Sequence, residues 1–413
     1  MPELMRLLYV TAENWPTFRA DVATLFGKYL PRLGIRSDLV TGRAPGAAVQ
    51  AWGGGEAFLG DVSGSQVKKH LKTFLHIWRQ LRAIDLSRYD AIQVRDLPLP
   101  ATLALWVARR KGLPFFYWMS YPMPEGQLAR ARENGPLSGI RKFFFPWLRG
   151  QTGRFLLYKI VLPRADHVFV QSERMKQDMI ALGVAAGKMT PVPMGVDLET
   201  MDLESIPPTD DPRLASRRVL AYLGTLDPPR RIEILFEMLA LVQQSEPAAL
   251  LVLVGDTHDS EHRAWLKSRS EQAGVAEHVV WTGWLPMREG WRYIREAEVG
   301  LSPFPRGFLL DSASPTKVAE YLALGIPVVC NDNPDQQALV EAAAVGRCTP
   351  YTADNFARAV LELLRMPADE RDKMGKRGRK LVTQEREYRM LAAGLASHYR
   401  EILKKLRMDT AEK

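Results

Sequence analysis

One short segment in the C-terminal half, beginning Ser-Pro-Thr-Lys, combines residue types that suit the binding of an anion. Ser314 is expected to cap a helix and Pro315 to occupy its first position, where a missing N–H costs nothing. The hydroxyl of Thr316 and the charge of Lys317 then lie beside free backbone amides at the positive end of the helix dipole. Glu320 follows one turn later, where a carboxylate reaches a sugar hydroxyl next to the anion. Taken alone, the segment is explained better by a capped helix with solvated charges.

A second group of cations stands at another helix start in the same half. The loop after an apolar run begins with Gly224 and Thr225, and Arg230 and Arg231 precede the next expected helix. Two arginines at this end of a helix are disfavoured by its dipole unless an anion lies between them and the amides. The pair therefore favours a phosphate site, in which one charge-assisted hydrogen bond contributes about 1.5–3 kcal/mol.

Two further loops follow buried apolar runs of this half. Gly255 ends one run, and Gly283, Trp284 and Leu285 follow the next. In open α/β sheets ligands bind outside the carboxyl ends of the strands, so these loops are expected to border the same pocket. The side chain of Trp284 is expected to form one wall. Backbone groups would read a bound base, so its identity is not encoded in these side chains.

Short apolar runs alternate with amphipathic segments along both halves of the chain, which predicts two doubly wound α/β domains with parallel sheets. The expected strands lie at 6–11, 35–41, 91–95, 114–119 and 167–171 in the first half, and at 219–223, 250–254, 279–282, 299–302 and 327–330 in the second. The predicted domains span residues 1–198 and 199–385, and residues 386–413 form a C-terminal helix. An Asp- and Pro-rich stretch, 199–218, is the expected linker.

Several of these motifs resemble glycosyltransferase family 4. The resemblance is carried by the Ser-Pro-Thr-Lys-x-x-Glu-Tyr motif of 314–321, by the pair Arg230 and Arg231, and by the segment 191–197. Members of that family are retaining enzymes of the GT-B fold. The resemblance implies two Rossmann-like domains facing a cleft, with the acceptor in the first, the nucleotide sugar in the second, and a C-terminal helix crossing back onto the first. The Ser-Pro-Thr-Lys form resembles a subgroup linked to surface or exopolysaccharide biosynthesis.

The resemblance also assigns roles to residues of this chain. Arg230, Arg231 and Lys317 would hold the leaving diphosphate, and Asp311 would contact the donor sugar. The other implied donor contacts are Gly224, Thr225, Gly255, Gly283, Trp284, Leu285, Ser314, Pro315, Thr316 and Glu320. The spacing of two acids in the family places Ser312 where the first acid is expected, with Asp311 one residue out of register. The sequence leaves two roles open for Asp311, one as a ligand of the donor sugar and one as the cap of its loop.

The implied activity is the transfer of a hexose-type sugar, with retention, from a nucleotide-diphosphate sugar to a saccharide or lipid-linked acceptor, in polysaccharide or glycoconjugate biosynthesis. The chain has no D-x-D sequence and no His/Cys cluster, so no metal is expected, and cations and helix amides would take its place. No cofactor is expected beyond the nucleotide-sugar substrate. Two alternatives are open. A non-catalytic GT-B nucleotide-binding or scaffold protein fits the displaced acid, and a Rossmann oxidoreductase would need a G-x-G-x-x-G motif that neither half supplies after its first strand.

The net charge of +9 indicates an acidic partner. Cations alternate with bulky apolar residues in 130–164, which suits an anionic membrane surface, whereas no nucleic-acid-binding module is recognised. The alternative for 130–164 is a pair of helices whose aromatic side chains pack in the core. Cys330 and Cys348 indicate no disulfide framework, and residues 1–10 resemble a first strand more than a signal peptide. The expected location is the cytoplasm, including the inner face of the cytoplasmic membrane.

Overall fold

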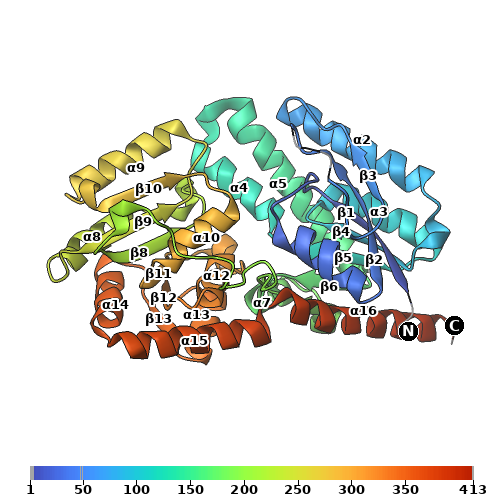
Figure 1. The fold of residues 1–413 in the computed structure, drawn as a ribbon. Helices are drawn as coiled ribbons and strands as arrows, with labels where there is room; N and C mark the ends of the chain where they lie inside the picture. The colour runs from blue at the N-terminus through green and yellow to red at the C-terminus, as the bar shows by residue number, and fades with distance from the viewer. Residues whose placement is uncertain (1–3, 47, 49, 412–413) are drawn as a thin grey trace. The chain divides into compact units, whose positions relative to one another are not determined.

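The computed structural model describes residues 4–46, 48 and 50–411. The chain divides into two compact units, Met1–Met194 with Tyr388–Lys413, and Gly195–Glu387 (Figure 1). The N-terminal unit is therefore built from two separate stretches of chain, the second of which is the last helix. Among the described helices, none has both the length and the apolar character that crossing a membrane requires.

In the N-terminal unit the described residues form one parallel sheet in the order β3-β2-β1-β4-β5-β6-β7. The strands are β1 Met5–Thr11, β2 Ile35–Gly42, β3 Ala57–Gly60, β4 Ala91–Arg95, β5 Phe115–Met119, β6 His167–Val170 and β7 Met189–Pro191. The strand order runs outward from the centre in both directions, so the chain changes direction between β1 and β4. At such a switch point, loops from the two strands diverge and leave room for a ligand.

Helices cover both faces of this sheet. One face packs against α2 Gln66–Ala83, α3 Pro98–Lys111 and α7 Glu173–Ala181. The other face packs against the helical segment Asp21–Tyr29 and the last helix, α16 Tyr388–Ala411. The buried side of α16 carries Tyr388, Leu395 and Tyr399. Helices α4 Met123–Asn134 and α5 Phe145–Phe155 pack against each other at the carboxyl end of the sheet.

The described residues of the C-terminal unit form a second parallel sheet, in the order β10-β9-β8-β11-β12-β13. Its strands are β8 Arg218–Leu223, β9 Ala249–Val254, β10 Val279–Gly283, β11 Val299–Ser302, β12 Val328–Asn331 and β13 Gly346–Thr349. Its helices are α8 Ile234–Gln243, α9 Ser260–Gln272, α10 Met287–Arg295, α11 Phe308–Asp311, α12 Thr316–Ala323, α13 Pro334–Ala342, α14 Ala353–Arg365 and α15 Ala368–Glu385. The switch point of this sheet lies between β8 and β11.

The doubly wound α/β fold that the sequence predicts is confirmed in both units. Its strands are nearly continuous apolar runs because helices bury both faces of each parallel sheet. The boundary after Met194 lies slightly before the predicted end of the first domain at 198. The predicted linker 199–218 differs from the structure, because Met201, Ile206 and Leu214 are buried in the core of the C-terminal unit.

Tyr321, on α12, closes the gap where β8 and β11 separate at the switch point. Its hydroxyl accepts a hydrogen bond from the backbone N–H of Leu223 at 2.7 Å and donates to the carbonyl of Leu301 at 3.0 Å. The ring fits because residue 300 is glycine, where an added Cβ would lie 2.5 Å from the ring. The side chain after Glu320 in the motif therefore holds α12 against the ends of two strands.

Candidate functional site

Strands β8 and β9 are each followed directly by a glycine, Gly224 and Gly255, and the backbones of these two glycines are in contact. A Cβ at Gly255 would lie 2.1 Å from the carbonyl oxygen of Gly224, so no side chain fits there. The N–H of Gly224 donates to the carbonyl of Val254, and the N–H of Leu226 to that of Asp256, both at 2.9 Å. The loop after β8, which includes Thr225, is thereby fixed to the end of β9.

Lys317, in the first turn of α12, places its ammonium group beside Gly224. A Cβ added to Gly224 would lie 3.6 Å from the Nζ atom. Nζ is buried, lies 3.9 Å from the centroid of the Tyr222 ring, and has no hydrogen-bond partner among the described residues. The ring face attracts a cation but accepts no proton from it in the way that an oxygen atom does. A buried ammonium group without a partner is costly, and an anion bound here would reduce that cost.

The electrostatic surroundings of Lys317 also disfavour its charged form in the ligand-free protein. Burial lowers the pKa of Lys317 well below its ordinary value of 10.5, and the charge of Arg230 lowers it further, against the opposing effect of Glu320. Burial also raises the pKa of Glu320. A strong ion pair would shift both values the other way, so the two side chains do not neutralise each other. The positive charge of Lys317 is therefore available to a ligand.

The structure distinguishes the two arginines that the sequence leaves unranked. Arg230 ends a single turn of 3-10 helix, and its guanidinium carbon lies 5.0 Å from the centroid of the Phe304 ring. The charge of Arg230 lowers the pKa of Lys317. Arg231 is in the left-handed backbone region with a φ of 48°, and its exposed side chain lies 3.5 Å from Glu233. The structure thus brings Arg230 to Lys317, and it directs Arg231 to a surface carboxylate.

Helix α12 begins one residue later than the sequence predicts. Pro315 occupies the N-cap position, Thr316 is the first helical residue, and no side chain caps the helix. The hydroxyl of Ser314 instead donates to Asp335 at 2.7 Å, and Arg386 pairs with the same carboxylate at 3.0 Å. The prediction of a serine cap is wrong because this ion pair takes the hydroxyl. The amides at the start of α12 consequently lack the side-chain cap that would compete with an anion.

Glu320 is held by two neighbouring side chains. The indole Nε1–H of Trp291, on α10, donates to Glu320 Oε1 at 3.2 Å, and Thr316 also hydrogen-bonds to the carboxylate. Trp291 is buried, so its ring fixes the direction of the carboxylate. The sequence analysis missed Trp291. The sequence gives little indication that Trp291 belongs to the site, since a Trp on the inner face of an amphipathic helix is ordinarily a core residue.

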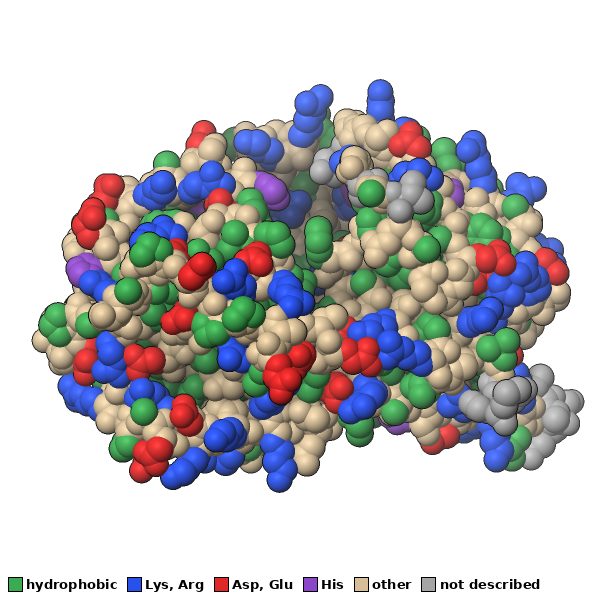
Figure 2. Space-filling view, in the orientation of Figure 1, with side chains coloured by type: hydrophobic (Ala, Val, Ile, Leu, Met, Phe, Trp, Pro, Cys, Tyr) green, Lys and Arg blue, Asp and Glu red, His purple; other side chains and the backbone are tan. Residues whose placement is uncertain are grey.

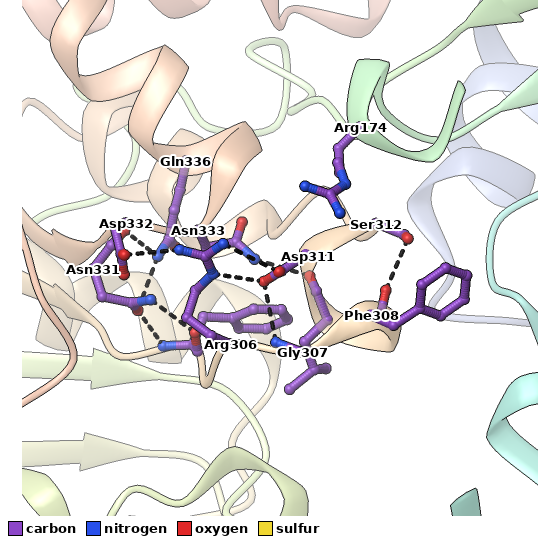
Figure 3. A network of polar contacts seen from close by, with 12 residues as sticks. Arg174, Arg306, Gly307, Phe308, Asp311, Ser312, Asn331, Asp332, Asn333 and Gln336 are labelled. Carbon is purple, nitrogen blue, oxygen red and sulfur yellow. Dashed lines mark hydrogen bonds and ion pairs between the residues drawn. The ribbon is translucent and has the colours of Figure 1, made fainter. Parts of the chain in front are cut away.

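Asp311 performs the loop-capping role in this structure (Figure 3). Its two carboxylate oxygens accept from Arg306 at 2.8 and 3.2 Å, and one also accepts from the N–H of Gly307 at 3.2 Å. Arg306 in turn reaches Asp332 at 2.7 Å. Ser312, at the position expected for an acid, donates its hydroxyl to the carbonyl of Phe308. A role of Asp311 toward a donor sugar would require it to share its carboxylate with Arg306.

The loop after β10 presents an aromatic surface. Trp284 is half exposed and stacks on His258, with ring centroids 4.9 Å apart and an interplanar angle of 26°. Gly283, with a φ of 70°, precedes Trp284, and Leu285 packs against the hydrophobic core. His258 follows β9, so two loops at the carboxyl edge supply this stacked pair of rings. The sequence analysis named Trp284 and missed His258, which only the fold places beside it.

A buried cluster of charges lies at the carboxyl end of β4 in the N-terminal unit. Arg95 pairs with Asp21 at 2.9 Å and with Glu13 at 3.2 Å. Asp96 follows, with a φ of 54°, and accepts from the backbone N–H of Ser120 at 2.8 Å. A non-glycine residue in this region is strained, and such strain concentrates at ligand sites. The sequence does not bring these residues together, because they are far apart along the chain.

The two aromatic runs of 130–164 differ in the structure. In the run 155–158, Leu157 belongs to the hydrophobic core and Tyr158 packs against it. In the run 143–148, Phe144, Phe145 and Trp147 are each about two-fifths exposed, at 44%, 42% and 39%. Phe155, in the second run, is also exposed, at 60%, so the expectation that the aromatic side chains pack in the core holds for Tyr158 and not for these others. Elsewhere, Lys and Arg lie among Asp and Glu on the face seen in Figure 2, without forming a single basic stripe there.

Two family models match the chain, and together they span most of it. The model described as "Glycosyl transferase 4-like domain" matches residues 20–195. The model described as "Glycosyl transferases group 1" matches residues 210–381, which contain Lys317, Arg230 and the other candidate residues of the C-terminal unit. No curated protein matches the chain significantly in sequence.

Solved structures with this fold include three that align over almost the whole chain. HepE of Anabaena, crystallised with UDP, is 14% identical, with a TM-score of 0.69 over 96% of this chain and 100% of that one. Sucrose-phosphate synthase of Thermosynechococcus elongatus is 18% identical, with a TM-score of 0.69 over 97% and 100%. An α,α-trehalose-phosphate synthase (UDP-forming) of Burkholderia vietnamiensis is 12% identical, with a TM-score of 0.68 over 96% and 100%. At these identities the likeness establishes the fold.

Replacing Lys317 with Met should stabilise the ligand-free protein at neutral pH by about 1–3 kcal/mol, because an apolar side chain removes a buried charge that lacks a partner. The folded-state pKa of Lys317 is lowered, so below 10.5 the unfolded state binds more protons. The advantage of Lys317→Met should therefore shrink as the pH rises toward 10.5. Urea denaturation at several pH values measures this, with the exposed Lys376→Met as the control. A Lys317→Met protein less stable than the wild type would contradict it.

Proposed function

Since its two matched domains make this chain a family-4-like glycosyltransferase with the GT-B fold, we propose that it transfers a hexose-type sugar, with retention, from a nucleotide-diphosphate sugar. The acceptor is a saccharide or a lipid-linked saccharide, and the product serves polysaccharide or glycoconjugate biosynthesis. The enzyme works in the cytoplasm, including the inner face of the cytoplasmic membrane.

The observation that carries this proposal is the ammonium group of Lys317. It is buried, it lacks a hydrogen-bond partner in the described chain, and it lies at the switch point of the C-terminal sheet beside Arg230. The uncapped amides of α12 begin one residue before it. A diphosphate supplies the negative charge and the acceptor oxygens that these groups lack.

The same groups suit the chemistry of transfer. The bond from the sugar C1 to the diphosphate oxygen breaks, a bond from C1 to the acceptor oxygen forms, and the acceptor proton passes to the departing phosphate. Negative charge develops on the diphosphate, where Lys317, Arg230 and the α12 amides stabilise it. Glu320, oriented by Trp291, accepts a hydrogen bond from a ribose hydroxyl. These cations take the place of a metal ion, so we propose that transfer needs none and no further cofactor.

The nucleotide is proposed to carry uracil. Crystal structures of HepE contain UDP and UDP-glucose, which makes uridine nucleotides the first candidates for a chain of the same fold. The stacked pair of Trp284 and His258 offers a flat surface for a base. Gly283 and Leu285 would present backbone groups to its edge, as the resemblance implies.

One observation favours a second candidate, a GT-B protein that binds nucleotides without turnover. The carboxylate of Asp311 is engaged by Arg306, and Ser312 hydrogen-bonds back to its own loop, so neither acid position offers a free carboxylate to a donor sugar. The two candidates differ in outcome, because a scaffold binds the nucleotide without transferring or hydrolysing the sugar.

We expect UDP to raise the melting temperature of the protein more than GDP or ADP does. Arg230→Gln should lower kcat/KM for UDP-glucose by tenfold or more, because one charge-assisted hydrogen bond contributes about 1.5–3 kcal/mol. Arg231→Gln is the matched control, because the side chain of Arg231 lies at Glu233. This change should alter kcat/KM by less than about twofold. The absence of any shift with all three nucleotides would refute the proposed function. Binding without turnover would support the scaffold.

Membrane attachment through 130–164 is part of the proposal. Phe144, Phe145 and Trp147 are exposed on one short stretch, next to Arg141 and Lys142, which is the combination that binds an anionic interface.

Flotation with vesicles that contain anionic phospholipid tests this attachment. We expect the wild type to float with the vesicles and the triple variant Phe144→Ala, Phe145→Ala, Trp147→Ala to stay behind, since it loses the exposed apolar area. Trp106→Ala, at a similarly exposed Trp on α3, is the control and should float. Unchanged flotation of the triple variant would contradict the attachment.

A further inference from the structure

The N-terminal unit contains a large pocket at the switch point of its own sheet. The pocket has a volume of about 870 Å³, and Ala12, which follows β1, and Asp96, which follows β4, line it. This is the edge at which doubly wound sheets bind ligands. Most of its wall is apolar and comes from α2, α3, α4 and α5 and the residues next to them, including Phe74, Leu97, Leu99, Met123, Phe155 and Leu156.

Two cations and a histidine also line this pocket, with side chains that are half-buried or exposed. Lys69 and His70 come from α2, and Arg149 comes from α5. Arg149 Nη1 lies 2.7 Å from His70 Nε2. A guanidinium group only donates, so Nε2 accepts and the imidazole is neutral, with its proton on Nδ1. Burial and the charge of Arg149 both lower the pKa of His70, which agrees with a neutral ring. The histidine thus adds a hydrogen-bond donor without adding charge.

The positive charge in the pocket is not balanced by the chain. Neither Lys69 nor Arg149 forms an ion pair with a carboxylate of the described residues, and burial, with a further contribution from the charge of Arg130, lowers the pKa of Arg149. Asp96 lines the same pocket, but it accepts hydrogen bonds from Ser120 and lies 3.3 Å from Arg95. The carboxylate of Asp96 therefore has partners of its own, and no ion pair joins it to Lys69 or Arg149 in the described part of the chain.

We propose that this pocket binds the acceptor, and that the acceptor is a saccharide linked to a long apolar chain through a phosphate or diphosphate ester. This rests on the proposed function. The phosphate contacts Lys69, Arg149 and the Nδ1–H of His70, and the chain lies along Phe74 and Leu99. A free sugar would place polar hydroxyls against most of the apolar wall. A fatty chain alone would leave the two cations without an anionic partner.

The entry side of the pocket agrees with this occupant. Phe155 lines the pocket and is 60% exposed, and it lies on the same helix, α5, as the exposed Phe145 and Trp147. The apolar wall thus continues into the surface through which we propose membrane attachment. A chain held in a bilayer can pass from the lipid into the pocket without crossing water, which avoids the cost of exposing it.

The test uses the full-length protein with UDP at saturation, so that the donor site is occupied, and three probes. The probes are farnesyl diphosphate, inorganic diphosphate and farnesol, titrated by calorimetry. We expect farnesyl diphosphate to bind at least tenfold more tightly than either of the other two. Lys69→Gln and Arg149→Gln should each weaken it about tenfold, the effect of one lost charge-assisted contact. Arg79→Gln, an exposed change on the same helix α2, is the control.

Each other outcome overturns the proposal. Equal binding of inorganic diphosphate would make the pocket a site for a soluble anion, and equal binding of farnesol would make the cations irrelevant. Unchanged affinity in both Lys69→Gln and Arg149→Gln, with melting temperatures like that of the wild type, would place the probe elsewhere. The preceding titration with UDP reports on the donor site separately. A failure of the proposed function would be seen there as an absence of UDP binding, before any probe is added.

Discussion

The ammonium group of Lys317 lies inside the C-terminal unit, 3.9 Å from the centroid of the Tyr222 ring and without a hydrogen-bond partner in the described chain. Desolvating a cation costs several kcal/mol, and the ring face returns only about 2 kcal/mol of that. Arg230 adds repulsion, and Glu320 does not neutralise the charge. The folded protein therefore carries a buried cation at a cost that a bound anion would reduce, which is why we propose Lys317 as a diphosphate contact.

The surrounding elements fix the position of that charge. The contact between the backbones of Gly224 and Gly255 brings the loop after β8 close to Nζ. Tyr321 ties α12 to the ends of β8 and β11, so the helix that carries Lys317 cannot shift along the sheet. Trp291 fixes Glu320 one turn away. In the N-terminal unit Lys69 and Arg149 line the pocket at the other switch point, and neither forms an ion pair with a carboxylate of the described residues.

The fold was predictable from the sequence, because strands buried on both faces are apolar throughout and stand out between amphipathic helices. Lys317 and Glu320 were predictable as a pair on one helix, since their spacing is local. The sequence could not rank Arg230 and Arg231, because their directions depend on a left-handed residue and on Phe304. It misplaced the cap of α12, since Asp335 and Arg386, which engage Ser314, are distant in the chain. A contact of Asp311 with the donor sugar is still a prediction, since Asp311 is engaged by Arg306.

Proton uptake on nucleotide binding tests the role of Lys317 most directly. Burial lowers the pKa of Lys317 in the free protein, and a bound diphosphate would raise it, so binding in alkaline buffer should take up protons at Nζ. Calorimetric titration with UDP in buffers of different ionisation enthalpy gives the number of protons taken up. The account predicts a net uptake by the wild type that falls to near zero in Lys317→Met. UDP binding with no proton uptake, or with the same uptake in both proteins, would contradict it.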